Sequence, residues 1–394
     1  MRSNGKSNSS EREAYLAFIS PTVVTWAIKR SGLEREFIAE KLKIHATQLE
    51  EWGRLGGSHP PFVKAQDLAK LLHVPFGYFF LKNPPPVGLP LPDFRGFDRD
   101  YQPSSDLLEL LNDILIKQDW YRDFVKESSG KPLGFVGSFS TDNSISDVAA
   151  DIRLRLDITQ RLRQSVTSWS EYLSTITRQT EEVGILVMRS GVIANITKRK
   201  LRIEELQGFA LADPIAPIVF VNSTDFKASQ IFTIAHELAH IWIGQSALAN
   251  ANELEEDGLN RIETFCNRVA AEVLVPKEEF LNAWRHDSGT AHHRIIHIAR
   301  EFWVSSLVSL RRAHECGQVT DYEFQRIKKD ELQHRSKAKS SGGDYYRNVI
   351  ARMSARLTNA VIGEVNNGNL PLRDAARLLG MKVPTLARFA EMWK

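Results

Sequence analysis

The chain contains one short motif whose residue types and spacing indicate a chemistry directly. The stretch Ile231 to Ile243 reads IFTIAHELAHIWI and carries His236, Glu237 and His240. On a helix, residues i and i+4 lie one turn apart on the same face, so both imidazoles can bind one Zn²⁺ ion. Glu237 would then act as general base, taking a proton from a water molecule and returning it to a leaving amine. The motif therefore predicts peptide hydrolysis.

The alternative interpretation is a chance pentapeptide on a buried helix. The residues around the motif are apolar at almost every position, which predicts a buried helix. Two histidines and a glutamate in such a helix need a partner, because a buried polar group without one is costly. This requirement favours the metal interpretation.

A catalytic zinc site uses three protein ligands and leaves one position for water, so a third ligand is needed. The stretch 260–276, NRIETFCNRVAAEVLVP, has apolar residues at helical spacing. It carries Glu263 in its first turns and Asn267 one turn later, so we expect Glu263 to bind the metal and Asn267 to orient a metal-bound imidazole. The competing carboxylates are Glu253, Glu255, Glu256 and Asp257, in a charge run typical of solvated surface, and Glu272, the stronger rival.

The two blocks together resemble the ImmA/IrrE family of metallopeptidases, whose motif pairs H-E-x-x-H with a later E-x-x-A-N-x-F-A-A-x-L-L-x-P. The second block here runs from Glu263 to Pro276 and reads ETFCNRVAAEVLVP. It has Cys266 in place of the usual Ala and Val269 in place of the usual Phe. Both differences are small, apolar and away from the ligands.

The resemblance covers roughly residues 182–276 and implies an α+β, zincin-like and more specifically gluzincin-like peptidase core. It implies that His236, His240 and Glu263 are zinc ligands and that Glu237 is the general base. It also implies limited, triggered cleavage of a regulatory protein, typically a repressor or an antitoxin. Family members of this construction are often linked to mobile elements, phage or toxin-antitoxin loci.

Composition restricts the class of protein. The 394 residues are 42% hydrophobic, enough for roughly two to four domains with buried cores. The net charge of +3 is too balanced to indicate nucleic-acid binding by itself. Two cysteines, Cys266 and Cys316, cannot form a disulfide framework, which favours a reducing cytoplasm. The start lacks the apolar core of a signal peptide, and no run of about 18 apolar residues occurs, so we expect a cytoplasmic protein without a membrane partner.

The expected fold class is multidomain and mainly α with a small β-sheet. The expected segments, in chain order, are a disordered lead (1–13), an Xre-like helix-turn-helix domain (14–82), a proline-rich linker (83–104), a helical connector (105–180), the peptidase core (181–325), a flexible basic linker (326–343) and a C-terminal helical, helix-turn-helix-like unit (344–394). Three apolar, β-branched runs predict strands at Val183–Met188, Gly208–Leu211 and Pro217–Asn222. An edge strand there could hold an extended substrate by main-chain hydrogen bonds.

The stretch Thr22 to Phe80 shows short helical patterns and resembles the Xre-type helix-turn-helix domain. Residues Phe37 to Leu42 correspond to the first helix of the motif, and Ala46 to Trp52 to the recognition helix. The resemblance implies that the early residues of the recognition helix, His45, Thr47 and Gln48, face the major groove of DNA.

Acidic residues in the same helix weaken the case for DNA. Glu50 and Glu51 place negative charge where phosphates would approach. Protein binding or homodimer formation is the alternative for this domain. The stretch Leu370 to Met392 resembles a second helix-turn-helix, with Pro384 to Phe389 as its later helix, and DNA and protein recognition remain equally open there.

A second histidine pair, His293 and His297, also has i and i+4 spacing. Its nearest acids are Asp287 and Glu301, and basic residues alternate with the histidines. We interpret it as an exposed basic face rather than a metal site.

Taken together, these patterns predict a cytoplasmic zinc metalloendopeptidase fused to helix-turn-helix modules that bring it to DNA or to a protein partner. The partner would be a substrate or the product of a neighbouring gene, namely a repressor, an antitoxin or a toxin. Two alternatives stay open: a DNA-binding regulator whose peptidase-like core is a sensor, and an antitoxin-like module that neutralises a toxin without proteolysis.

Overall fold

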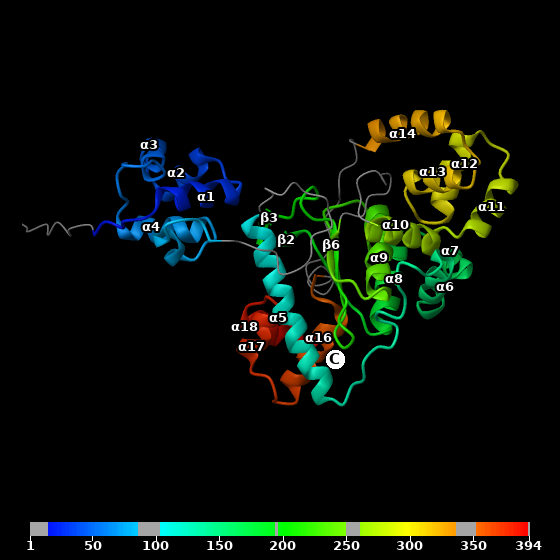
Figure 1. Cartoon of the computed structure of the whole chain (residues 1–394). Coiled ribbons are helices and arrows are strands. Elements are labelled where there is room, and N and C mark those ends of the chain that lie inside the picture. The colour runs from blue at the N-terminus through cyan, green and yellow to red at the C-terminus, as the bar shows by residue number, and fades with distance from the viewer. Residues whose placement is uncertain (1–14, 86–102, 194–195, 250–260, 336–351, 393–394) are drawn as a thin grey trace, which may run out of the picture. The chain divides into compact units, whose positions relative to one another are not determined.

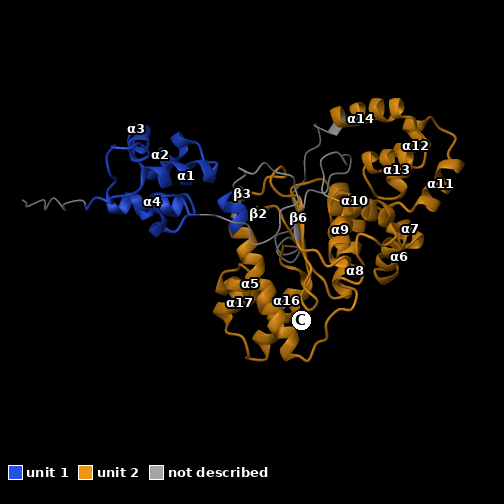
Figure 2. Ribbon diagram, viewed as in Figure 1, with its two compact units in different colours: residues 1–89, 100–108 blue, residues 90–99, 109–394 orange. Residues whose placement is uncertain are grey.

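The computed structural model describes residues 15–85, 103–193, 196–249, 261–335 and 352–392. The chain divides into two compact units, residues 1–89 with 100–108 and residues 90–99 with 109–394 (Figure 2). The lead expected at 1–13 and most of the expected proline-rich linker lie outside the described residues.

The first unit is a small helical domain. Its residues 15–85 form α1 (Pro21–Ser31), α2 (Arg35–Leu42), α3 (Ala46–Trp52), α4 (Phe62–Leu71) and the 3-10 helix η1 (Phe76–Phe80). Glycine at position 32, with φ of 65°, ends α1 in the left-handed conformation that favours this residue. Trp52, Leu68 and Phe79 are buried in one apolar cluster, which holds the short helices together. The helix predicted at Ala46–Trp52 has the same bounds in the structure.

The second unit contains the sheet and most of the helices (Figure 1). Its four-stranded sheet has the order β1 (Leu186–Ser190), β5 (Ile218–Asn222), β4 (Gly208–Leu211), β6 (Ala247–Ala249). Strand β1 runs parallel to β5, whereas β4 is antiparallel to both β5 and β6. The three predicted strands are present, and β6 forms the edge next to β4.

Three further strands were not predicted. A hairpin of β2 (Val192–Ile193) and β3 (Ile196–Lys200) follows β1. Strand β3 carries three basic residues in ITKRK, and β6 is only three residues long with no β-branched side chain, so neither gives the apolar pattern of a strand.

The helices before the sheet are α5 (Ser105–Glu127), α6 (Ile145–Arg155), α7 (Gln160–Ser165) and α8 (Trp169–Glu182). Helix α9 (Lys227–Trp242) packs against β4, β5 and α8, and α10 (Arg261–Leu274) packs against α9 and α6. Helix α9 is buried from Ser229 to Trp242, where it packs against the sheet and the neighbouring helices. The Trp242 indole donates a hydrogen bond to Asp151 Oδ2 at 2.7 Å, which ties α9 to α6.

Four helices follow α10: α11 (Lys277–His286), α12 (Ala291–Glu301), α13 (Ser306–Glu315) and α14 (Asp321–Arg335). The flexible linker predicted from residue 326 was wrong over residues 326–335, which belong to α14. The composition of α14 is mostly basic and polar, so its residue pattern offered little sign that Phe324 and Ile327 pack into the main apolar cluster of this unit. The remainder of the predicted linker lies outside the described residues.

The last helices are α16 (Ala355–Asn366), α17 (Leu372–Leu378) and α18 (Val383–Met392). Ser354 caps α16 by accepting the Leu357 N–H, and its hydroxyl also bonds to the buried carboxylate of Glu181. The Arg356 guanidinium donates to the Tyr121 hydroxyl at 2.6 Å. These contacts attach the start of α16 to α5 and α8. Within the described residues, no helix has the length and apolar character needed to cross a membrane.

The packing of α14 predicts that Ile327 is essential to its order. Ile327 is 1% exposed, and removing most of a buried isoleucine side chain costs about 2–5 kcal/mol. Ile327→Ala should therefore speed amide hydrogen exchange across 321–335, measured by mass spectrometry. Leu332, 45% exposed, supplies the control, since Leu332→Ala should change little. Exchange in the wild type as fast as in an unfolded peptide would refute a packed helix.

Candidate metal centre

Helices α9 and α10 bring the predicted zinc ligands together. His236 and His240 lie one turn apart on α9, and Glu263 lies in the first turn of α10. All three side chains are buried. Within the described residues, the ligand atoms of these three side chains lie close enough together to hold one metal ion.

The distances within this group fit a small divalent cation. His236 Nε2 lies 3.2 Å from Glu263 Oε2 and 3.2 Å from His240 Nε2, and His240 Nε2 lies 3.2 Å from Glu263 Oε1. A tetrahedral ion with ligand distances of about 2.0–2.2 Å separates its ligand atoms by about 3.3–3.6 Å. Nitrogen and carboxylate oxygen are also the donors that zinc accepts. The three residues therefore fit zinc in chemistry and in spacing.

The electrostatics of the three ligands favour the forms that bind a metal. Burial alone raises the pKa of Glu263, but hydrogen bonds and positive charge from His236 and His240 lower it to about 2. Burial lowers the pKa of His240, and this outweighs the opposing effect of the Glu263 carboxylate. An ionised carboxylate and a neutral imidazole are the states that coordinate metal, and the directions of the pKa shifts of Glu263 and His240 favour them.

Glu237 lies beside this group without a partner of its own. Its side chain is fully buried, and neither carboxylate oxygen has a hydrogen-bond partner within the described part of the chain. Burial raises its pKa well above the usual value, and repulsion from Glu263 adds to this effect. Burying a carboxyl group without a hydrogen-bond partner costs free energy, and such groups are often found at functional sites, where they transfer protons.

Sequence reasoning missed Gly208, the first residue of β4. A Cβ atom there would lie 2.9 Å from Glu237 Oε1, 2.8 Å from the Phe220 carbonyl oxygen and 2.5 Å from Thr233 Cγ2. Only glycine leaves room for α9 and the Glu237 carboxylate to approach β4 this closely. A glycine at the start of an apolar strand was the available signal.

Two other buried residues, Asn267 and Cys266, lie near the ligands. Asn267 is buried beside the group, but its amide makes no hydrogen bond to the described residues, so the predicted contact with an imidazole is not observed. Cys266 is fully buried, and burial raises its pKa, which keeps the thiol protonated.

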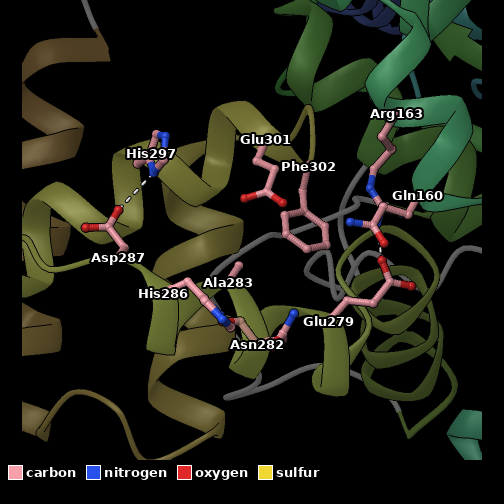
Figure 3. A pocket seen from close by; sticks show the side chains of 10 residues that line it. All are labelled: Gln160, Arg163, Glu279, Asn282, Ala283, His286, Asp287, His297, Glu301 and Phe302. Atoms are coloured by element: carbon pink, nitrogen blue, oxygen red, sulfur yellow. Dashed lines mark hydrogen bonds and ion pairs between the residues drawn. The ribbon is translucent and has the colours of Figure 1, made fainter.

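The rival carboxylate and the second histidine pair lie in other environments. Glu272 accepts the Lys277 N–H at 3.1 Å and pairs with Arg312 at 3.1 Å, so it has structural partners away from the metal group. His297 donates from Nδ1 to Asp287 Oδ2 at 2.8 Å, as Figure 3 shows. The side chains of His293 and His297 are 70% and 64% exposed, which agrees with a surface role.

The residues predicted to face DNA are exposed on the first unit. His45 precedes α3, and Thr47 and Gln48 lie in its first turn. Gln48 Oε1 accepts the His45 N–H at 3.1 Å, so this side chain caps its own helix. Their contact with DNA stays a prediction.

Comparison with known families supports the peptidase interpretation. Residues 180–314 match a peptidase family model described as the IrrE N-terminal-like domain. This part of the chain is therefore similar to the IrrE N-terminal-like domain. Residues 353–392, which include α16, α17 and α18, match a domain of unknown function, DUF8813. No curated protein matches the chain.

The geometry predicts one zinc ion per chain, measured by plasma mass spectrometry on purified protein. His236→Ala/His240→Ala should abolish stoichiometric zinc, because one carboxylate is left for a site that needs three ligands. Glu272→Ala is the matched control and should retain the metal, since Glu272 pairs with Arg312 instead. One zinc per chain in the double histidine variant would disprove this site.

Proposed function

We propose that the chain is a zinc-dependent metalloendopeptidase that makes a limited cut in a regulatory protein, a repressor or an antitoxin. The observation that carries the proposal is the set of three donor side chains whose atoms lie 3.2 Å apart. The Glu237 carboxyl lies next to them and has no hydrogen-bond partner among the residues that the structure describes. The match of residues 180–314 to a peptidase family supports the same reaction class.

The roles of the residues follow from their chemistry. His236, His240 and Glu263 would hold the ion. Zinc supplies Lewis acidity, which lowers the pKa of a water molecule and polarises a peptide carbonyl. Glu237 would accept a proton from that water and deliver it to the leaving amine, since it is a buried carboxyl group beside the ligands.

Burial of the site supports triggered rather than constitutive cleavage. The side chains of His236, Glu237, His240 and Glu263 have no exposed surface. A protein substrate must contact these groups to be cut, so the site has to open first. An opening step that depends on a signal or partner would restrict cleavage to one condition and one substrate.

The same burial favours one alternative, in which the core is a sensor or binding module. A metal in a closed site can stabilise the fold without reacting, as structural zinc sites do. In that case the helical modules would act as a DNA-binding regulator or neutralise a toxin, with no peptide bond broken.

Glu237→Gln separates the two functions. The amide keeps nearly the same shape but cannot accept and return a proton, so proteolysis should fall by about 10²–10⁴-fold while zinc stays bound. Cleavage is measured on the product of the neighbouring gene, in cells under DNA damage or phage-like stress. Glu127→Gln, at the exposed end of α5, is the charge-matched control and should cleave as the wild type does.

An intact partner under stress in the wild type and in both variants would contradict the peptidase proposal. Equal cleavage by Glu237→Gln and wild type would instead remove Glu237 from the reaction. Each result differs from the expected one, in which only Glu237→Gln preserves the partner.

DNA binding by the first unit would be strongly salt-dependent and sensitive to Gln48→Glu in the full chain. Glutamate preserves the acceptor that caps α3 and adds a charge that repels phosphate, so affinity should fall about tenfold without loss of thermal stability. Thr47→Ala should weaken binding, whereas Thr22→Ala, on the exposed start of α1, should not. Fluorescence anisotropy with duplex DNA measures both effects. Salt-independent binding, or no effect of Gln48→Glu on affinity, would contradict DNA recognition and favour protein recognition by this unit.

A further inference from the structure

A large cavity lies outside the metal centre, between α6, α10, α13 and α14. Its volume is about 920 Å³, and its wall includes residues from all four helices together with the first residue of α11. This volume is within the range of about 300–1,000 Å³ that is typical of small-molecule sites. The cavity is therefore large enough for a ligand the size of a nucleotide.

The wall of this cavity has an excess of positive charge. Five of its residues are lysine or arginine, and two are glutamate. The side chains of Arg268, Lys277 and Lys328 make no hydrogen bond or ion pair with any residue that the structure describes. Three cations without partners around one cavity repel each other, and an anion between them would relieve that repulsion.

A buried arginine adds a fixed donor to the wall. The Arg312 side chain is 8% exposed, and its Nε has no hydrogen-bond partner among the described residues. Its terminal nitrogens lie 3.1 Å from Glu272 and 3.1 Å from Glu315, which hold the guanidinium in place. A guanidinium fixed in this way is a common element of phosphate recognition.

Two apolar residues are also part of the wall. Ile145, at the start of α6, and Phe324, on α14, both line the cavity. The Phe324 ring packs against His314, with the ring centroids 4.7 Å apart. The cavity thus combines cations with an apolar and aromatic surface, as a ligand with both a charged group and a ring system requires.

We propose that this cavity binds a phosphate-bearing small molecule of nucleotide size. Arg268, Lys277, Arg312 and Lys328 would contact the phosphates, and the apolar surface would contact the rest of the ligand. A smaller cavity of about 230 Å³, drawn in Figure 3, has a different character, because its wall has no lysine and its Arg163 and His297 are paired with Glu279 and Asp287.

The proposed site does not depend on the metal centre. Glu263 and Glu272 are nine residues apart on α10, about two and a half turns, so they lie on opposite faces of the helix. A variant without zinc ligands can therefore keep the cavity, and a failure of the peptidase proposal leaves this one standing.

The test is isothermal titration of the full chain with ATP, ADP and adenosine. We expect saturable binding of ATP and ADP, and binding of adenosine at least about tenfold weaker because it lacks phosphate. Lys277→Gln/Lys328→Gln should weaken ATP binding by about tenfold or more. Lys126→Gln/Lys329→Gln removes the same charge from exposed positions outside the cavity and should leave the affinity unchanged.

Cys316 gives a second readout that locates the ligand. It lines the cavity and is partly exposed, whereas Cys266 is buried. Bound ATP should therefore slow alkylation of Cys316 by iodoacetamide, followed by mass spectrometry, and Cys266 should stay unreactive with and without ATP.

Several results would overturn the proposal. One is the absence of saturable ATP or ADP binding up to about 1 mM. Another is an affinity for adenosine equal to that for ATP. A third is an equal loss of ATP affinity in the two lysine double variants. Binding of a single-stranded oligonucleotide or an acidic peptide, without binding of either nucleotide, would assign the surface to a macromolecule and refute a small-molecule site.

Discussion

The burial of ionisable groups next to α9 is the constraint on which the rest of the structure depends. Two imidazoles and two carboxyl groups lie in a mainly apolar core, and all four are fully buried. An isolated charge in such a place costs several kcal/mol. A divalent cation would offset this cost by satisfying His236, His240 and Glu263 together, and its charge would also favour the ionised form of Glu237.

The fold supplies this arrangement by packing two helices against one another and against a small sheet. Helix α9 presents both histidines on one face, and α10 brings Glu263 to that face. Gly208 allows β4 to lie against Glu237 without a clash. The region of 180–314 that matches the peptidase family contains all of these residues. The same α10 contributes its other face to the large positively charged cavity.

The histidine pair on one helix and the main strands could be predicted from the sequence, because local patterns determine both, whereas their role as metal ligands stays a prediction. The spacing of His236 and His240 is a property of one helix, and β4 and β5 are apolar runs with clear ends. Contacts between distant segments were harder to predict. Residues 326–335 of α14 were taken for a linker, since Ile327 is the residue among them that packs into the core and most of the others are polar or charged. Gly208 and the wall of the large cavity depend on several elements meeting, which no local pattern shows. The helix-turn-helix assignments and the zincin-like class remain predictions.

The central claim is that His236, His240 and Glu263 form a zinc site, and X-ray absorption at the zinc edge tests it most directly. The account predicts nitrogen and oxygen neighbours at about 2.0–2.2 Å, with the outer-shell scattering of two imidazole rings. Sulfur at about 2.3 Å would contradict it, because it would place zinc on Cys266 or Cys316. A spectrum without imidazole scattering would contradict it as well.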